Sequence, residues 1–281
     1  MSQSLGTALV TGASTGIGAV YADRLAKRGH DLILVARDEA RLTALAERLR
    51  QETGVAVDIL KADLTHRADL AKVEQRLASD PTITLLVNNA GGAANGAFET
   101  LGADRLENLI QLNVVSVTRL TAAVAPAFVA RGQGSIINIA SVLAIAPEIG
   151  MPVYNATKAF VLSLSQSLQN ELGPKGVYVQ VVLPAATRTE IWERAGMSID
   201  ALPDGSVMDV NDLVDAALVG FDAREKVTIP PLADEAQWQA FEAARLAMLP
   251  GFRTDTPAAR YLKTAADGQV WSTERVMESL T

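Results

Sequence analysis

Strand-length apolar runs alternate with longer segments of helical periodicity along the first two thirds of the chain. The strand-like runs are residues 7–10, 32–35, 55–59, 83–87, 135–140 and 177–183. The helix-like segments between them are residues 16–29, 38–52, 67–78, 103–130 and 153–172. Runs that are apolar on both faces are typical of a parallel sheet covered by helices on each side. The pattern therefore predicts a three-layer α/β fold, a doubly wound sheet whose strands end at one ligand-binding edge.

The regular alternation stops after Pro184. Residues 187–208 carry apolar side chains among polar ones without a strand pattern, and we interpret them as a lid over a substrate site. A helix over 211–221, a strand over 226–229 and a helix over 236–248 are predicted beyond it. Because no linker or repeat interrupts the chain, we expect residues 1–281 to form a single domain with a C-terminal extension over about 250–281.

Composition narrows the class of partner and the compartment. The 281 residues have a net charge of −7 and dispersed basic residues, which disfavours a nucleic-acid partner because phosphate binding needs clustered positive charge. The first residues lack the pattern of a signal peptide, and no apolar run reaches the length expected of a bilayer-spanning helix. The chain has no cysteine and only two histidines, which argues against a catalytic zinc. We therefore expect a cytoplasmic protein without a membrane, nucleic-acid or metal partner.

A glycine-rich segment, Thr11-Gly12-Ala13-Ser14-Thr15-Gly16-Ile17-Gly18, lies between the first predicted strand and the first predicted helix. Glycines at such a turn let the backbone approach a pyrophosphate at the positive N-terminus of the helix. The alternative is that they only mark a strand-to-helix turn. Because the segment stands at the first such turn of an alternating chain, we interpret it as a dinucleotide site. Its predicted contacts are Gly12, Ser14, Thr15, Gly16, Ile17 and Gly18.

The second predicted strand ends in Ala36, which is followed by Arg37. NAD-selective enzymes commonly carry an acid at this place to bind the ribose 2′-hydroxyl, and here that acid is missing. Arg37 instead offers a fork of hydrogen-bond donors for a 2′-phosphate, which favours NADP over NAD. The alternative is an exposed arginine that pairs with Asp38 at the surface.

Polar residues also follow the third and fourth strands. The carboxylate of Asp63 would accept a hydrogen bond from an adenine amino group with Leu64 near the ring; equally, Asp63 would cap the following turn. In Asn88-Asn89-Ala90-Gly91 the amides would tie strand ends together and the small residues would leave room for a ribose, unless the segment is a plain turn. The predicted cofactor contacts here are Asp63, Leu64, Asn89, Ala90 and Gly91.

Tyr154 and Lys158 are four residues apart on a predicted helix and therefore share one face. Ser141 stands thirteen residues before Tyr154, just past the fifth strand, on the edge already assigned to the cofactor. The alternative is a solvent-facing tyrosine and lysine with Ser141 in a turn. Asn113 interrupts an apolar helical stretch, where a buried amide needs partners. It would hold a water on a proton path to Lys158 or satisfy a neighbouring backbone group.

These residue types suit the reduction of a carbonyl by hydride. A phenol has an ordinary pKa of about 10, and a nearby ammonium lowers that pKa. Tyr154 would be the acid in reduction and the base in oxidation, while Lys158 lowers the pKa of Tyr154 and holds the nicotinamide ribose. Ser141 would donate a hydrogen bond to the carbonyl oxygen as negative charge develops on it.

Together these motifs resemble those of the short-chain dehydrogenase/reductase family. The matching residues are Thr11-Gly12-x-x-x-Gly16-x-Gly18, Asp63, Asn88-Asn89-Ala90-Gly91, Asn113, Ser141, Tyr154-x-x-x-Lys158 and Pro184, in the family's order over roughly residues 5–190. The resemblance implies a Rossmann-like sheet of about seven strands, a homodimer or homotetramer, and a metal-free tetrad of Asn113, Ser141, Tyr154 and Lys158. It also implies cofactor contacts from Tyr154, Lys158, Pro184, Thr187 and Thr189, the last two at the nicotinamide carboxamide and a phosphate.

Two positions depart from the family's pattern. Ala185 follows Pro184 where the family usually has glycine, so the alanine would be strained if that position needs a positive φ. Otherwise its methyl group would lie close to the nicotinamide. Thr15 stands where many NADP-dependent relatives carry a basic residue, which weakens the NADP assignment.

The predicted substrate segments are mostly apolar through Val142, Leu143, Ile145, Ile149, Met151, Trp192 and Met197. They favour a medium-sized apolar ketone, aldehyde or secondary alcohol, unless they are packing material. We therefore expect an NADP-dependent carbonyl reductase or alcohol dehydrogenase that acts on a small molecule. The rival functions are a lyase or epimerase on the same fold, or an NADP-binding regulatory or scaffold protein. The last would have no use for a proton donor such as Tyr154.

Overall fold

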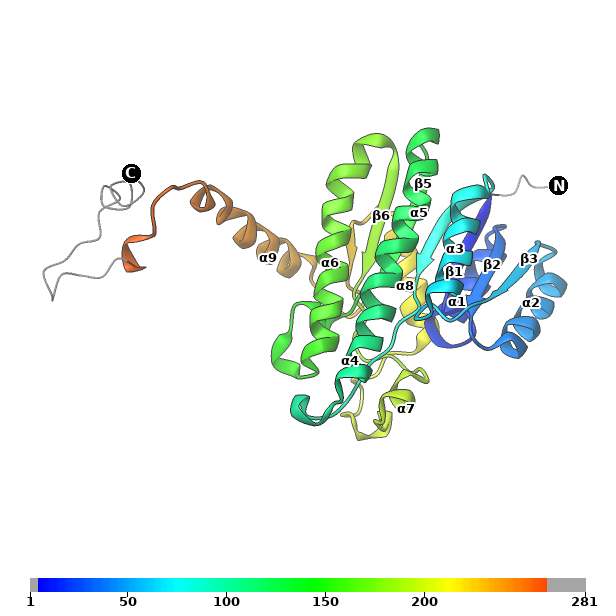
Figure 1. Cartoon of the computed structure of the whole chain (residues 1–281), viewed down its shortest axis with the longest axis horizontal. Helices are drawn as coiled ribbons and strands as arrows, with labels where there is room; N and C mark the ends of the chain where they lie inside the picture. The colour runs from blue at the N-terminus through cyan, green and yellow to red at the C-terminus, as the bar shows by residue number, and fades with distance from the viewer. Residues whose placement is uncertain (1–4, 262–281) are drawn as a thin grey trace, which may run out of the picture. The chain divides into compact units, whose positions relative to one another are not determined.

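The structure of the protein, a computed structural model, describes residues 5–261. The chain divides into two compact units, Met1–Pro231 and Leu232–Thr281, and the first contains the whole sheet and every predicted site residue (Figure 1). The single domain with a C-terminal extension over about 250–281 stays a prediction. The second unit contains helix α9 (Glu235–Ala247), which the sequence predicted closely and which has no buried residue. Residues 262–281 of the expected extension lie outside the described part of the chain.

Seven parallel strands form one sheet in the order β3-β2-β1-β4-β5-β6-β7. They are β1 (Thr7–Thr11), β2 (Asp31–Ala36), β3 (Val57–Lys61), β4 (Ile83–Asn88), β5 (Gly134–Ile139), β6 (Val177–Val182) and β7 (Val227–Thr228). The strand order reverses between β1 and β4, and ligands of open parallel sheets bind outside such a switch point. The predicted doubly wound sheet is confirmed.

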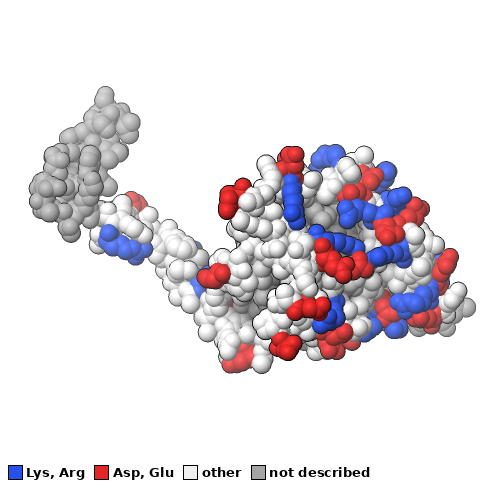
Figure 2. Space-filling model, turned by 90° about the horizontal axis from the view of Figure 1, so that it is seen from below, with Lys and Arg blue, Asp and Glu red and all other residues white. Residues whose placement is uncertain are grey.

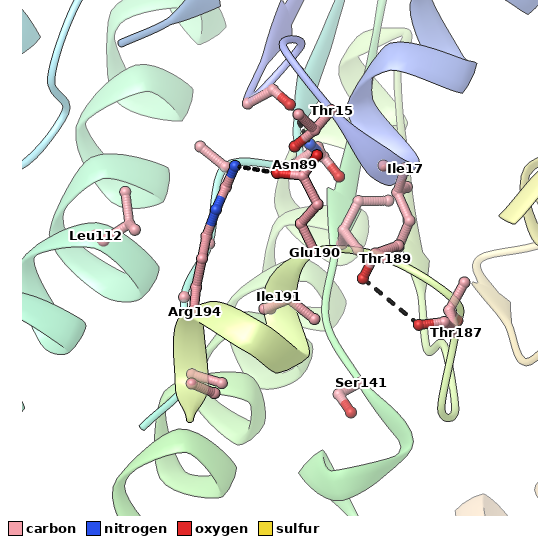
Figure 3. Close-up of a pocket in the computed structure, with 18 of the residues that line it drawn as sticks. Thr15, Ile17, Asn89, Leu112, Ser141, Thr187, Thr189, Glu190, Ile191 and Arg194 are labelled. Carbon is pink, nitrogen blue, oxygen red and sulfur yellow. Dashed lines mark hydrogen bonds and ion pairs between the residues drawn. The ribbon is translucent and has the colours of Figure 1, made fainter. Parts of the chain in front are cut away.

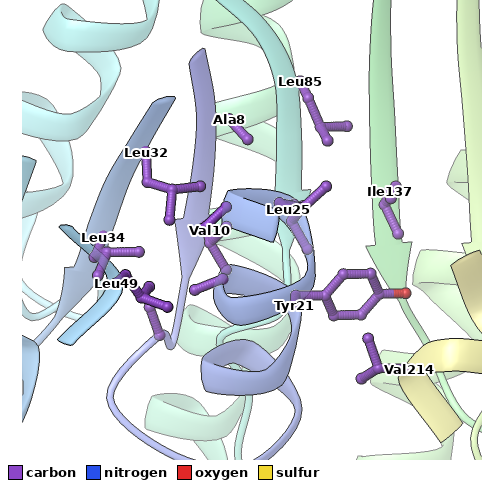
Figure 4. Close-up of a cluster of buried hydrophobic side chains, with 14 of the residues drawn as sticks. Ala8, Val10, Tyr21, Leu25, Leu32, Leu34, Leu49, Leu85, Ile137 and Val214 are labelled. Carbon is purple, nitrogen blue, oxygen red and sulfur yellow. The ribbon is translucent and has the colours of Figure 1, made fainter. Parts of the chain in front are cut away.

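Helices cover both faces of the sheet and bury one apolar cluster on each side. One face carries α1 (Gly16–Lys27), α2 (Glu39–Thr53) and α8 (Val210–Asp222). Tyr21 and Leu25 of α1 and Val214 of α8 pack there on strand residues (Figure 4). The other face carries α3 (Arg67–Ser79), α5 (Ser116–Arg131) and α6 (Pro152–Leu172). Apolar burial of this kind is the main driving force for folding.

Local signals set the ends of these helices. Asp38 caps α2 by accepting a 3.0 Å hydrogen bond from the backbone N–H of Arg41, and α2 ends at Gly54 in the left-handed conformation. Short 3₁₀ turns connect other elements at Phe98–Thr100, Val142–Ala144, Pro147–Ile149, Gly173–Lys175 and Ile199–Ala201, and in the second unit at Leu249–Phe252 and Ala259–Tyr261. Acidic and basic side chains are interspersed over the face shown in Figure 2. Ion pairs between them join separate elements of the first unit, as between Arg24 and Asp215 and between Arg76 and Asp58.

The predicted helix over 103–130 is interrupted by one π turn. Helix α4 (Ala103–Ile110) runs into the π turn Gln111–Val115 and then into α5, and the Ser116 N–H donates to the carbonyl of Gln111. The whole helix is long and apolar enough to cross a membrane by length and composition, so the expectation that no segment reaches that length is wrong. A helix that covers the core of a globular protein meets the same test, and this one packs against α3 and the sheet.

The lid region folds back on the end of the sheet. Thr187 and Met208 form a short parallel bridge, with Arg188 N–H donating to the Met208 carbonyl at 3.0 Å and Met208 N–H donating to the Ala186 carbonyl at 2.9 Å. Between them lies the short helix α7 (Ile191–Ala195). The segment has no strand pattern because it lies outside the sheet.

Candidate active site

A pocket of about 440 Å³ lies at the carboxyl ends of the central strands (Figure 3). It extends from the glycine-rich turn to the lid. All the predicted cofactor and catalytic residues line it except Gly18 and Asn113. Of the predicted substrate residues, Leu143, Met151, Trp192 and Met197 line it, whereas Val142, Ile145 and Ile149 do not. The expectation for these three is not met: Ile145 and Ile149 are exposed, and Val142 is half-buried without lining the pocket.

The glycine-rich turn is packed too closely for side chains at two positions. Gly12 has a φ of +66°, and a Cβ there would lie 2.9 Å from the Cα of Ala90. A Cβ at Gly18 would lie 2.3 Å from the carbonyl oxygen of Gly12. The side chain of Thr15 makes no cap hydrogen bond at the start of α1, and the first turn has no acidic residue. The N-terminal amides of α1 are thus left to an anion, as a pyrophosphate site requires.

Arg37 lies at the pocket edge with a largely exposed guanidinium group. Its Nη1 is 3.8 Å from Oδ2 of Asp63 rather than paired with Asp38, which pairs with Arg41 at 3.3 Å. Oδ1 of Asp63 accepts hydrogen bonds from the N–H and the hydroxyl of Thr65. Burial raises the pKa of Asp63, but the Thr65 hydrogen bonds and the Arg37 charge outweigh it and hold that pKa below its usual range. Of the two predicted roles, the geometry shows the turn-capping one.

Asparagines join the strand ends beneath the pocket, as their pattern predicted. Asn89 donates to the carbonyl of Thr11 at 2.9 Å and so ties β4 to β1. Asn88 donates to Asn138 of β5 at 2.9 Å and to Thr121 of α5 at 3.1 Å. Sequence reasoning missed Asn138 and Thr121, although a polar residue within an apolar strand is a signal that could have found Asn138. These buried bonds fix the floor on which the site residues stand.

Ser141, Tyr154 and Lys158 meet at one end of the pocket. Ser141 follows β5, and its hydroxyl is close enough to Tyr154 for a hydrogen bond. Lys158 is buried one turn after Tyr154, with Nζ 5.7 Å from the tyrosine ring centroid. Its ammonium donates a 2.8 Å hydrogen bond to the carbonyl of Ile139. The backbone of α6 and the end of β5 thus place three polar side chains around one point.

The protonation chemistry differs from the sequence expectation. Burial raises the pKa of the Tyr154 phenol, and the hydrogen bond with Ser141 lowers it by less. Burial also lowers the pKa of Lys158 to about 8. The prediction that the ammonium would bring the phenol below its ordinary pKa is not met in this structure, because burial disfavours the phenolate more than the hydrogen bond with Ser141 favours it. At neutral pH, the Tyr154 phenol therefore stays protonated.

Asn113 lies in the π turn with its amide fully engaged. Oδ1 accepts from the N–H of Gly92 at 2.9 Å, and Nδ2 donates to the Gly92 carbonyl and to the Thr157 hydroxyl, both at 3.0 Å. The side chain thus satisfies neighbouring groups, the second of the two predicted possibilities. Thr157 precedes Lys158, and Gly92 follows the pocket residue Gly91. Asn113 therefore ties together two segments of the pocket wall.

Two residues near the site, Ala185 and Met151, differ in the sign of their backbone φ. Ala185 is not among the residues with positive φ, so the alanine after Pro184 is unstrained. Met151, three residues before Tyr154, does have a left-handed backbone with a φ of 59°. Asn155 holds this turn by donating to the Gly150 carbonyl at 2.6 Å. A non-glycine residue in this conformation costs about 1–2 kcal/mol and often marks a functional site.

The lid contributes pocket residues that sequence reasoning missed. Glu190, Ile191 and Arg194 line the pocket beside the predicted Thr187 and Thr189. The Thr187 hydroxyl donates to the Ala185 carbonyl at 3.0 Å, and Trp192 Nε1 donates to the Thr187 carbonyl at 2.8 Å. Nothing in the local pattern identified Glu190 or Arg194, because their partners come from folding rather than from periodicity.

Comparisons with known proteins agree with this geometry. A family model of short chain dehydrogenases matches residues 6–198. Human 17-beta-hydroxysteroid dehydrogenase type 3 is 36% identical over 184 residues, a match that covers 65% of this chain and 59% of that protein. The short-chain dehydrogenase from Sphingobium yanoikuyae in complex with NADPH is 60% identical, with a TM-score of 0.90 over 92% of this chain and 100% of that one.

A second solved structure, the bulky-bulky ketone specific alcohol dehydrogenase from Comamonas testosteroni, is 53% identical. Its TM-score is 0.86, and the match covers 92% of this chain and 100% of that one. Three findings support one family assignment: the family match, the switch point in the sheet and the glycine-rich turn. The chain belongs to the short-chain dehydrogenase family of oxidoreductases, which use a nicotinamide cofactor.

Proposed function

We propose that this protein is an NADPH-preferring oxidoreductase that interconverts bulky apolar ketones and their secondary alcohols. The observation that carries the proposal is the meeting of Ser141, Tyr154 and Lys158 at one end of a pocket whose other end holds the glycine-rich turn and Arg37. A proton donor and a dinucleotide cradle in one pocket are what hydride transfer to a carbonyl requires.

The residues present fit a nicotinamide dinucleotide. The turn at Gly12 and Gly18 has no room for side chains, and the uncapped N-terminus of α1 suits a pyrophosphate. The exposed guanidinium of Arg37 would bind the 2′-phosphate of NADP, with no acid at Ala36 to favour NAD. The NADPH in the Sphingobium yanoikuyae complex, 60% identical to this chain, supports the same choice. Leu64, Asn89, Ala90, Pro184, Thr187 and Thr189 would complete the site.

The side chains divide the acid–base work among them. A bound reduced nicotinamide supplies the hydride. Tyr154 donates its proton to the carbonyl oxygen, and its raised pKa keeps that proton available at neutral pH. Ser141 donates a hydrogen bond to the same oxygen and stabilises its growing negative charge. Lys158 holds the ribose hydroxyls and favours the phenolate left behind, and Asn113 positions the pocket wall through Gly92 and Thr157.

The substrate class follows from the lining of the reactive end. Leu143, Met151, Trp192 and Met197 line the same pocket as Tyr154, so an apolar ketone is favoured over a sugar or a phosphorylated compound. The names of two similar proteins support a bulky apolar substrate. One is an alcohol dehydrogenase specific for bulky-bulky ketones, and the other is a 17-beta-hydroxysteroid dehydrogenase. A ketone with two large apolar substituents is therefore the proposed substrate.

The test follows NADPH and NADH oxidation against a panel of diaryl ketones, ketosteroids, small ketones and sugars. We expect NADPH and the bulky ketones to give the highest kcat/KM. Tyr154→Phe should bind NADPH normally in a fluorescence titration and lose turnover by about 100-fold or more. Arg37→Ala should reduce the preference for NADPH by about 10- to 100-fold. NADPH binding without turnover across the whole panel would instead indicate a binding or scaffold protein.

A further inference from the structure

An acidic side chain of the lid, Glu190, is held by two arginines. Arg41 Nη1 donates to both carboxylate oxygens of Glu190, at 2.7 Å and 2.9 Å. Arg194 Nη2 donates to Oε2 at 2.7 Å, one helical turn further along the lid (Figure 3). Arg41 lies in the first turn of α2, 149 residues before Glu190 in sequence. The Arg41–Glu190 pair therefore joins the lid to α2, the helix that follows Arg37.

The lid segment held in this way lies directly over the glycine-rich turn. A Cβ placed on Gly16 would come within 3.1 Å of the Thr189 side chain. Thr187, Thr189 and Glu190 all line the pocket, and the Trp192 indole is tied to the Thr187 carbonyl. Because a dinucleotide on the glycine-rich turn would lie beneath this strip, the contact between Glu190 and α2 closes one side of its exit.

The arrangement is more organised than an ordinary surface ion pair. Isolated exposed pairs contribute little because two flexible side chains must be ordered, but a network of charges keeps its members in place. Glu190 takes hydrogen bonds from two guanidinium groups, and Arg41 Nε is also 3.3 Å from the Asp38 carboxylate that caps α2. All of these side chains are about half exposed, so the contact can open without disturbing the core.

We propose that the network of Arg41, Glu190 and Arg194 is a clasp that holds the lid over the cofactor and slows release of the nicotinamide nucleotide. Glu190 is a positioning residue here, since it acts by keeping Thr187 and Thr189 against the cofactor rather than on the reacting atoms. The proposal rests on the proposed function in one respect, namely that the pocket binds a nicotinamide nucleotide.

Release of NADPH tests the clasp without any turnover. The enzyme loaded with NADPH is mixed with a large excess of NADP⁺, and the loss of bound-cofactor fluorescence is followed by stopped flow. Glu190→Gln and Arg41→Gln should each release NADPH about two- to fivefold faster. The double variant should release it no faster than the single variants, because each substitution breaks the same contact.

Two further readouts separate the clasp from a general structural role. Salt screens ion pairs, so release from the wild-type enzyme should accelerate between low salt and about 0.5 M KCl. Release from the variants should respond less to salt, because they no longer have the Arg41–Glu190 pair. The KM for NADPH should rise in the variants, in line with the faster release.

Asp222→Asn is the matched control. Asp222, the last residue of α8, forms a two-point pair with Arg28, the residue after α1, at 2.8 Å and 2.9 Å, and neither residue lines the pocket. This variant should release NADPH at the wild-type rate. Release from the Glu190 and Arg41 variants at the wild-type rate, or equal acceleration in the control, would overturn the clasp. A wild-type protein that binds neither NADPH nor NADH in a titration would overturn the proposed function and the clasp together.

Discussion

Replacing the buried lysine of the site should stabilise the fold while abolishing turnover. Lys158 is only 6% exposed, and burial lowers its pKa from 10.5 to about 8. That difference corresponds to about 3 kcal/mol by which the interior disfavours the ammonium. Lys158→Met removes the charge and keeps the length of the side chain, but it loses the hydrogen bond to Ile139, which is worth about 1–2 kcal/mol. The net expectation is a gain of about 1–2 kcal/mol at pH 7.

The pH dependence of this gain is its sharpest signature. Because the folded-state pKa is lower than the unfolded one, the unfolded chain binds more protons between about pH 8 and pH 10.5, and wild-type stability rises with pH through that window. The advantage of Lys158→Met should therefore be full at pH 7 and shrink as the pH approaches 10.5. Urea unfolding of both proteins at several pH values measures it. A variant that is less stable at pH 7, or an advantage that does not change with pH, would refute the reasoning.

Three other predictions concern burial, sterics and proton transfer. The Tyr21 hydroxyl is buried without a hydrogen-bond partner in the described structure, so Tyr21→Phe should raise the free energy of unfolding by about 1 kcal/mol. Thermal unfolding should show a Tm about 2–4 °C higher, and a lower Tm would contradict this. Gly18→Ala forces a Cβ against the Gly12 carbonyl and should weaken NADPH binding at least tenfold by fluorescence titration, whereas Gly102→Ala, in open space, should leave it unchanged. Since the pKa of Tyr154 is raised, the rate of carbonyl reduction should be constant around neutral pH and fall at alkaline pH, while the rate of alcohol oxidation should rise with pH. Opposite slopes in initial-rate profiles would rule out Tyr154 as the proton donor.

Much of the site was predictable because its residues follow strand ends. The glycine-rich turn, Asn89 and Ser141 all stand at the carboxyl ends of strands that apolar periodicity identifies, and parallel strands bring those ends to one edge. The spacing of Tyr154 and Lys158 placed both on one helical face for the same local reason. Periodicity could not show which side chains after Ser141 would face the pocket, because short turns have no repeating pattern.

The sequence by itself determined the order of strands and helices, the parallel sheet and the motifs along its edge, since these depend on hydrophobic period and on backbone requirements at single turns. Only the tertiary structure decided the contacts between distant segments and the electrostatic environment of each group. Arg41 meets Glu190 across 149 residues, and the π turn at Gln111–Val115 sets Asn113 against Gly92. The pKa of Tyr154 rises rather than falls because burial, a property of the packed fold, outweighs the hydrogen bond that Ser141 makes with it.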